Sequence, residues 1–115
     1  MAKDQNREKG KYFEEIARDF LKKKGYKILE QNYINKLGEI DIIAKFKKTI
    51  VFVEVKYRKN EYFGLPREAV NEFKQHKIRN IATSYLKSKK LLDSECRFDV
   101  VEILGDKITH IENCF

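Results

Sequence analysis

Apolar residues recur along the first part of the chain at the spacing of an amphipathic helix. Between residues 6 and 24 they stand three or four positions apart, so they form one stripe with lysine and arginine elsewhere around the helix. Gly25 follows the last turn, where glycine commonly ends a helix. We therefore expect one helix over residues 6–24. The stripe consists of Phe13, Ile16, Ala17, Phe20 and Leu21.

Three stretches with the character of β-strands follow this helix. They are residues 26–34, 39–46 and 49–57, and the last is especially rich in β-branched residues. Because these residues occupy both of its faces, this strand is expected at the centre of a sheet that is covered on two sides. Glycine and proline then mark a loop at 60–66.

A second helix and two closing strands complete the pattern. Residues 66–90 carry apolar positions along one side, and residues 96–104 and 108–115 read as two strands around the turn "GDK". The order αβββαββ, with local hairpins and a crossover helix, predicts an α/β fold in which a small mixed sheet is flanked by two main helices. The expected stripe of the second helix is Val70, Phe73, Ile81, Ala82 and Tyr85.

Composition agrees with one folded domain over residues 1–115. The chain is 42% hydrophobic, and its length suits a single modest core. The N-terminus lacks the apolar segment of a signal peptide, and no apolar run approaches the ~18 residues of a membrane span. We therefore expect a cytoplasmic protein. The formal net charge of +7 favours a polyanionic partner such as nucleic acid, with a merely solvated lysine-rich surface as the alternative.

Charged residues interrupt the apolar pattern of the second and third predicted strands. Strict alternation places Ile40 and Ile42 on one face of the second strand and Asp41 on the other. In the third strand, Glu54 and Lys56 share a face. If the hairpin between these strands turns symmetrically, Asp41 lies opposite Glu54, whereas a slip of one residue separates the two acids.

Two carboxylates on neighbouring strands are a candidate metal site. They repel each other, and partial burial raises the pKa of at least one of them unless a cation intervenes. Mg²⁺ (or Mn²⁺) prefers oxygen ligands and completes its shell with water and phosphate, which suits phosphodiester hydrolysis. A lysine such as Lys56 can orient the nucleophile or stabilise charge. The alternative is an ordinary cross-strand cluster of salt bridges at the end of the sheet.

Two of these segments resemble the bipartite motif of the PD-(D/E)XK nuclease superfamily, and the element order is similar to that superfamily's αβββαβ core. They are "GEID" at 38–41, with isoleucine in place of the motif's proline, and "VFVEVK" at 51–56. Over nearly all of its length the chain resembles the YraN family of bacterial proteins. The resemblance implies a restriction-endonuclease-like fold similar to archaeal Holliday-junction resolvases. The matching segments are "FEEIA" (13–17), "GEIDII" (38–43), "VFVEVKYR" (51–58), "FKQHKI" (73–78) and "RFDVV" (97–101).

The resemblance also implies roles for individual residues. Asp41 and Glu54 match the metal-binding acids, and Lys56 matches the catalytic lysine. Glu14 matches the first-helix glutamate that completes the metal site in resolvase-like members. It borders the apolar stripe, so it can reach the edge of the sheet, although a solvated position is equally compatible. Glu39 is an additional acid that can pair with Lys56 or assist metal binding.

The implied activity is that of a Mg²⁺- or Mn²⁺-dependent endonuclease acting on DNA, including the branched or structured DNA of repair and recombination. Small resolvase-like nucleases commonly act as symmetric dimers, so a homodimer is expected. Two alternatives stay open: a non-catalytic nucleic-acid-binding or protein-interaction module on the nuclease scaffold, and metal-dependent chemistry on another phosphate-containing substrate. The expected nucleic-acid contacts are Arg58, Lys74, Lys77 and Arg79, with Lys59, Arg67, Tyr57, Tyr62 and Phe63 as further candidates.

Overall fold

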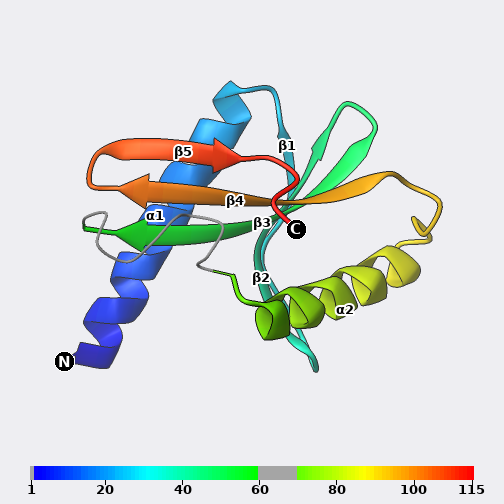
Figure 1. Cartoon of the computed structure of the whole chain (residues 1–115), viewed down its shortest axis with the longest axis horizontal. Coiled ribbons are helices and arrows are strands. Elements are labelled where there is room, and N and C mark those ends of the chain that lie inside the picture. The colour runs from blue at the N-terminus through cyan, green and yellow to red at the C-terminus, as the bar shows by residue number, and fades with distance from the viewer. Residues whose placement is uncertain (1, 60–69) are drawn as a thin grey trace.

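The computed structural model describes residues 2–59 and 70–115, and it shows one five-stranded mixed sheet with a helix on each side (Figure 1). The predicted αβββαββ order is confirmed. The last strand ends earlier than expected, and the start of the second predicted helix, at 66–69, lies outside the described residues. The elements are α1 (Ala2–Lys23), β1 (Lys27–Asn35), β2 (Gly38–Phe46), β3 (Thr49–Arg58), α2 (Glu72–Ser88), β4 (Cys96–Leu104) and β5 (Lys107–Ile111).

The strands lie in the sheet in the order in which they occur in the sequence. Neighbours are antiparallel except for β3 and β4, which run parallel. A parallel pair needs a crossover connection, and α2 belongs to it. The expected symmetric hairpin between β2 and β3 is confirmed, because Phe46 pairs with Thr49. Lys47 supplies the left-handed backbone of this turn with a φ of 55°.

Helix α1 covers one face of the sheet. Its small and apolar residues Ala17 and Leu21 are fully buried against Ile42, Val51 and Val53. Burial of a leucine side chain such as that of Leu21 stabilises the fold by roughly 1.5–3 kcal/mol, so this stripe holds α1 in place. Because its other sides are polar, α1 is not apolar enough to cross a membrane, and the same is true of α2 within the described ranges.

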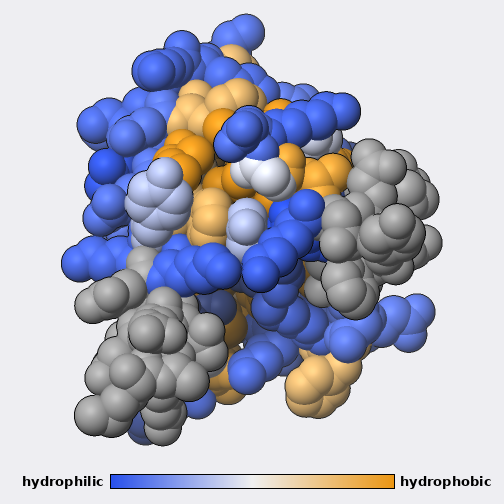
Figure 2. All heavy atoms as spheres, turned by 90° about the vertical axis from the view of Figure 1, so that its left-hand side faces the viewer, coloured by the Kyte–Doolittle hydropathy of each residue, from blue (hydrophilic) through white to orange (hydrophobic). Residues whose placement is uncertain are grey.

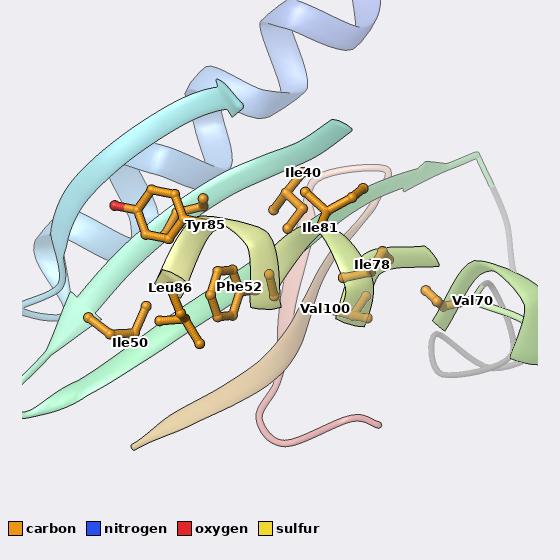
Figure 3. Close-up of a cluster of buried hydrophobic side chains, with 11 residues drawn as sticks. Ile40, Ile50, Phe52, Val70, Ile78, Ile81, Tyr85, Leu86 and Val100 are labelled. Atoms are coloured by element: carbon orange, nitrogen blue, oxygen red, sulfur yellow. The ribbon is translucent and has the colours of Figure 1, made fainter. Parts of the chain in front are cut away.

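Helix α2 covers the opposite face through a second cluster of buried side chains (Figure 3). Ile78, Ile81 and Tyr85 project from the helix onto Phe52 of β3 and Val100 of β4. The sheet is therefore buried on both sides, as the apolar composition of β3 predicted.

The sequence-based assignment of Phe73 to this buried stripe is wrong, because its side chain is 79% exposed. Phe73 and Ile81 are separated by more than two turns, and at 3.6 residues per turn they differ by about 80° around the helix axis. The buried stripe instead runs through Ile78, Ile81 and Tyr85, and it leaves Phe73 in the first turn facing solvent.

A polar network joins β4 to β5 on the α1 side of the sheet. The carboxylate of Asp99 is fully buried, lies 2.7 Å from His110 Nε2 and accepts hydrogen bonds from Arg97 and from the Asn113 N–H. Burial alone raises the pKa of Asp99, but these hydrogen bonds together hold it below its usual value. Arg97 also contacts the hydroxyl of Tyr26, so the network fixes the residues after α1 as well.

The molecule has a partly apolar face where β3 ends and β4 turns into β5. Figure 2 shows this side, on which hydrophobic residues gather in the middle and hydrophilic residues surround them. A hollow of ≈ 350 Å³ at this end is lined by Ile16 of α1, Ile103 of β4 and Ile108 of β5, together with Tyr57 of β3. Tyr57 also lines the acidic hollow described next, so the two regions adjoin.

Candidate metal centre

Strand β2 changes the face on which its side chains lie at Asp41. Ile40 belongs to the cluster under α2, whereas Ile42 belongs to the cluster under α1. Strict alternation, which placed both isoleucines on one face, is therefore wrong at this point. Strands β2 and β3 are paired as far as Ile42 and Val53, and Asp41 Oδ2 then accepts a hydrogen bond from the Val55 N–H at 2.8 Å. The carboxylate takes the place of a backbone acceptor, which fixes it between the two strands.

Three carboxylates converge at this point. Glu14 comes from α1, whereas Glu39 and Asp41 come from β2, and one oxygen of each lies within 4.8 Å of the others. The side-chain amide of Asn32 in β1 joins two of them. It donates hydrogen bonds to the two carboxylate oxygens of Glu14 at 2.8 and 3.0 Å and to Glu39 Oε1 at 2.9 Å. We call Glu14, Glu39 and Asp41 the acidic cluster.

The acidic cluster lines an open hollow of ≈ 640 Å³ between α1 and the edge of the sheet. Its wall includes Phe13 of α1 and Tyr57 of β3, whose rings stack with centroids 3.8 Å apart. Lys9 Nζ lies 5.3 Å from the centroid of the Tyr57 ring. The hollow is therefore accessible to a ligand from solvent, and one wall is aromatic.

Asn32 was missed by the sequence interpretation, which treated residues 26–34 as a uniform strand. Its backbone has a φ of 50°, a left-handed conformation that asparagine tolerates better than most residues do. Asparagine is depleted in β-strands, so its presence inside a predicted strand was the available signal. The pairing of β1 with β2 also shifts between Ile28 and Glu30.

Burial and mutual repulsion act on the carboxylates of the acidic cluster. Burial, followed by the negative charges of Glu54 and Glu14, raises the pKa of Asp41 to about 8, although the Val55 N–H and Lys74 act in the opposite direction. Burial and the charges of Glu39 and Glu54 likewise raise the pKa of Glu14. Its hydrogen bonds with Asn32 and Asp41 lower this pKa, but by less. Protons or a bound cation can relieve this repulsion.

Glu54 and Lys56 lie on the other side of Asp41, on the face of β3 that meets α2. Glu54 is 3% exposed, and its Oε2 lies 3.0 Å from Lys74 Nζ. Burial and a hydrogen bond with Lys74 lower the pKa of Lys56. Burial also pulls down the pKa of Lys74, but the contact with Lys56 and the charge of Glu54 outweigh this and raise it. Lys56 is thus the lysine that gives up its proton more readily.

The predicted site residues therefore form two adjoining groups rather than one. The acidic cluster lies on the α1 side, and Glu54, Lys56 and Lys74 lie on the α2 side. The charge of Glu54 acts on Asp41, which stands at the junction of the two groups. The oxygens of the acidic cluster lie close enough together to share one cation, and Lys56 and Lys74 lie near Glu54 in the neighbouring group.

The other predicted nucleic-acid contacts have different surroundings. Arg58 forms an ion pair at 2.8 Å with Glu102, and its side chain is only 9% exposed. Arg79 lies over the rings of Phe98 and Phe115 at 5.4 and 5.9 Å. Lys77 instead lies beside the start of β2, near the site. The candidates Arg67, Tyr62 and Phe63 lie outside the described residues.

The chain is similar in sequence to known proteins over most of its length. Residues 13–103 match the model of "Uncharacterised protein family UPF0102". A UPF0102 protein of Fusobacterium nucleatum is 50% identical over 107 residues, which cover 93% of this chain and 90% of that protein. UPF0102 proteins of Clostridioides difficile and Caldanaerobacter subterraneus are each 48% identical, over 96% and 92% of this chain and 98% and 93% of their own lengths. The matched region contains all the residues of both groups.

Proposed function

The chain belongs to the uncharacterised family UPF0102, the YraN family, and from its site we propose that it is a divalent-metal-dependent endonuclease that hydrolyses phosphodiester bonds in DNA. The observation that carries the proposal is the position of Asp41. Its carboxylate is held between two strands, where it meets two further acids on one side and the pair formed by Glu54 and Lys74 on the other. The order of these residues agrees with the PD-(D/E)XK motif that the sequence resembles.

The donor set fits Mg²⁺ or Mn²⁺. Carboxylate oxygens are the ligands that these hard cations prefer, and those of the acidic cluster lie close enough together to share one ion. Burial and the neighbouring negative charges raise the pKa values of Asp41 and Glu14, and a bound cation would offset both effects, which supports the proposal. Asp41, Glu14 and Glu39 would hold the ion, with Glu54 available from the neighbouring group.

When bound, the metal polarises a phosphoryl oxygen and lowers the pKa of a coordinated water. The chain's own residues supply the rest of the reaction. Lys56 in its neutral form can accept a proton from the attacking water at Nζ, because its pKa is lowered by burial and by Lys74. The new phosphorus–oxygen bond forms as the bond to the leaving oxygen breaks, and solvent protonates that oxygen. Lys74 keeps its positive charge beside Glu54 and can stabilise the phosphate.

DNA is the proposed substrate because the chain is basic and the open hollow leads directly to the acidic cluster. We place this activity in the cytoplasm, on branched or structured DNA of the kind that repair and recombination produce. A symmetric homodimer would present two such sites, one for each strand of a branched duplex.

The test is cleavage of a labelled four-way DNA junction with Mg²⁺, Mn²⁺ or EDTA. The wild type is expected to cut with either metal, and Asp41→Asn and Lys56→Met are each expected to lose at least about 100-fold in rate. Asp93→Asn is the matched control, because this acid lies in an exposed turn after α2. It is expected to cut as fast as the wild type.

Calorimetric titration of Mn²⁺ provides a second measurement that does not depend on turnover. The wild type is expected to bind the ion, and Asp41→Asn is expected to bind it at least tenfold more weakly. Cleavage that is equal in the wild type and Asp41→Asn would overturn the proposal. Salt-sensitive DNA binding with no metal binding at millimolar concentration would instead favour a non-catalytic nucleic-acid-binding module.

A further inference from the structure

The first turn of α2 exposes an aromatic ring next to the site. Phe73 is the most exposed large hydrophobic side chain among the described residues, and it directly precedes Lys74, which contacts Glu54. Leu37, in the turn between β1 and β2, is also exposed, at 47%. These two side chains line the same hollow.

This hollow, which we call the α2 hollow, has a volume of ≈ 330 Å³ and is lined by Leu37, Phe73, His76, Lys77 and Asn80. The volume lies at the lower end of the range for small-ligand sites. Its described lining combines an aromatic face, a side-chain amide, a lysine and a histidine, and none of these residues is acidic. That combination fits a nucleotide, because the ring can stack on a base, the amide can bond to a base edge and the lysine can pair with phosphate.

The α2 hollow lies beside the start of β2, the strand that carries Glu39 and Asp41 of the acidic cluster. Lys77 packs so closely over Gly38 that a Cβ atom on this glycine would lie 2.6 Å from Lys77 Cε. Glu39 directly follows Gly38, and Asp41 lies three residues after Gly38, which is about 10 Å along an extended strand. The α2 hollow and the acidic cluster therefore lie at the same end of β2.

We propose that the α2 hollow binds one unpaired nucleotide of the nucleic-acid substrate, with its base stacked on Phe73 and its phosphate on Lys77. The proposal rests on the proposed function and specifies its substrate class. A base inside a duplex has both faces covered by its neighbours, whereas a base in a single strand or at a branch point can present a free face. The hollow thus selects substrates that have unpaired nucleotides close to the bond that is cut.

A tryptophan at position 73 can report the stacking directly, because the chain contains no tryptophan. In Phe73→Trp, the addition of oligothymidine in EDTA is expected to quench the emission as a base stacks on the indole. Leu92→Trp is the matched control, because Leu92 is 57% exposed in the turn beyond the other end of α2. Its emission is expected to stay unchanged. Equal quenching in both variants, or in neither, would overturn the proposal.

Fluorescence anisotropy with Phe73→Ala tests the preference for unpaired nucleotides. This variant is expected to bind labelled oligothymidine about five- to 100-fold more weakly than the wild type, with less than about a twofold change for a blunt duplex of the same length. Equal weakening for both probes, or for neither, would overturn the proposal. A change from dimer to monomer in sedimentation would overturn it as well, since a second copy of the chain would then occupy the hollow. These measurements need no cleavage, so an inactive protein that passes them refutes only the proposed nuclease activity.

Discussion

Raising the pH from about 5 to about 8 is expected to destabilise the metal-free protein, because Asp41 must lose its proton inside the acidic cluster. The pKa of this carboxyl rises from 3.8 to about 8, mainly through burial and then through the charge of Glu54. Between these two values the folded protein binds more protons than the unfolded chain does. The stabilising contribution is therefore complete below pH 3.8 and is lost as the pH rises through about 8.

The size of this effect follows from the shift in the pKa. Each unit corresponds to about 1.4 kcal/mol, so the whole shift amounts to at most roughly 6 kcal/mol, of which about 3–4 kcal/mol falls between pH 5 and pH 8. A domain of this size is typically stable by about 5–15 kcal/mol, so the loss is large enough to measure. The lowered pKa of Lys56 acts in the opposite direction, since it makes stability rise with pH in the alkaline range below 10.5.

Urea denaturation followed by circular dichroism, in EDTA and over this pH range, measures the effect. The useful quantity is the difference in unfolding free energy between the wild type and Asp41→Asn, which has no proton to lose at this position. We expect the unfolding free energy of Asp41→Asn to increase relative to that of the wild type as the pH rises. That of the exposed-site control Asp93→Asn should follow the wild type throughout. Added Mg²⁺ should restore the unfolding free energy of the wild type at about pH 8 but not that of Asp41→Asn. A difference that stays constant with pH would refute the reasoning, because Asp41 would then ionise without cost.

Two further predictions concern backbone geometry and the buried network on β4. Gly38→Ala should lower the unfolding free energy by about 1–3 kcal/mol, because φ is +142° and the new Cβ would meet Lys77. Gly10→Ala, in the open part of α1, should instead raise it by up to about 1 kcal/mol. Urea denaturation that gave both variants the same sign would contradict this. Asp99→Asn should cost roughly 3 kcal/mol near neutral pH, because it removes the fully buried carboxylate that pairs with the partly buried Arg97. Because the folded-state pKa of Asp99 is lowered, this stabilisation is present above 3.8 and is lost as the pH falls further, so thermal melts of Asp99→Asn and the wild type should converge in acid and stay apart at neutral pH.

The fold could be predicted from the sequence because its elements are set by local patterns. The stripe that ends in Leu21, the glycine after α1 and the β-branched runs of β2 and β3 each indicate one element. The register of the hairpin was also predictable, because a shift of one residue would have moved Val51 and Val53 out of the core that α1 covers.

The details of the site depend on contacts that no local pattern contains. Asp41 departs from strict alternation because its carboxylate accepts the Val55 N–H, an interaction between two strands. Asn32 reaches the cluster only because β1 leaves its regular path at that residue. Phe73 was expected in the core because it fits an apolar stripe loosely, but the exact turn at which α2 begins decides on which side it lies. The general location of the acids was therefore predictable, whereas their partners were not.

The irregularity of β1 also has a consequence for how the molecule behaves in a concentrated solution. Strand β1 forms one edge of the sheet, and its outer N–H and C=O groups are a template on which a strand of another molecule could pair. The left-handed residue Asn32 and the register shift between Ile28 and Glu30 interrupt that template in two places. The same distortion that brings an amide to the carboxylates thus protects the sheet from edge-to-edge aggregation, so a substitution that straightens β1 affects solubility together with the site.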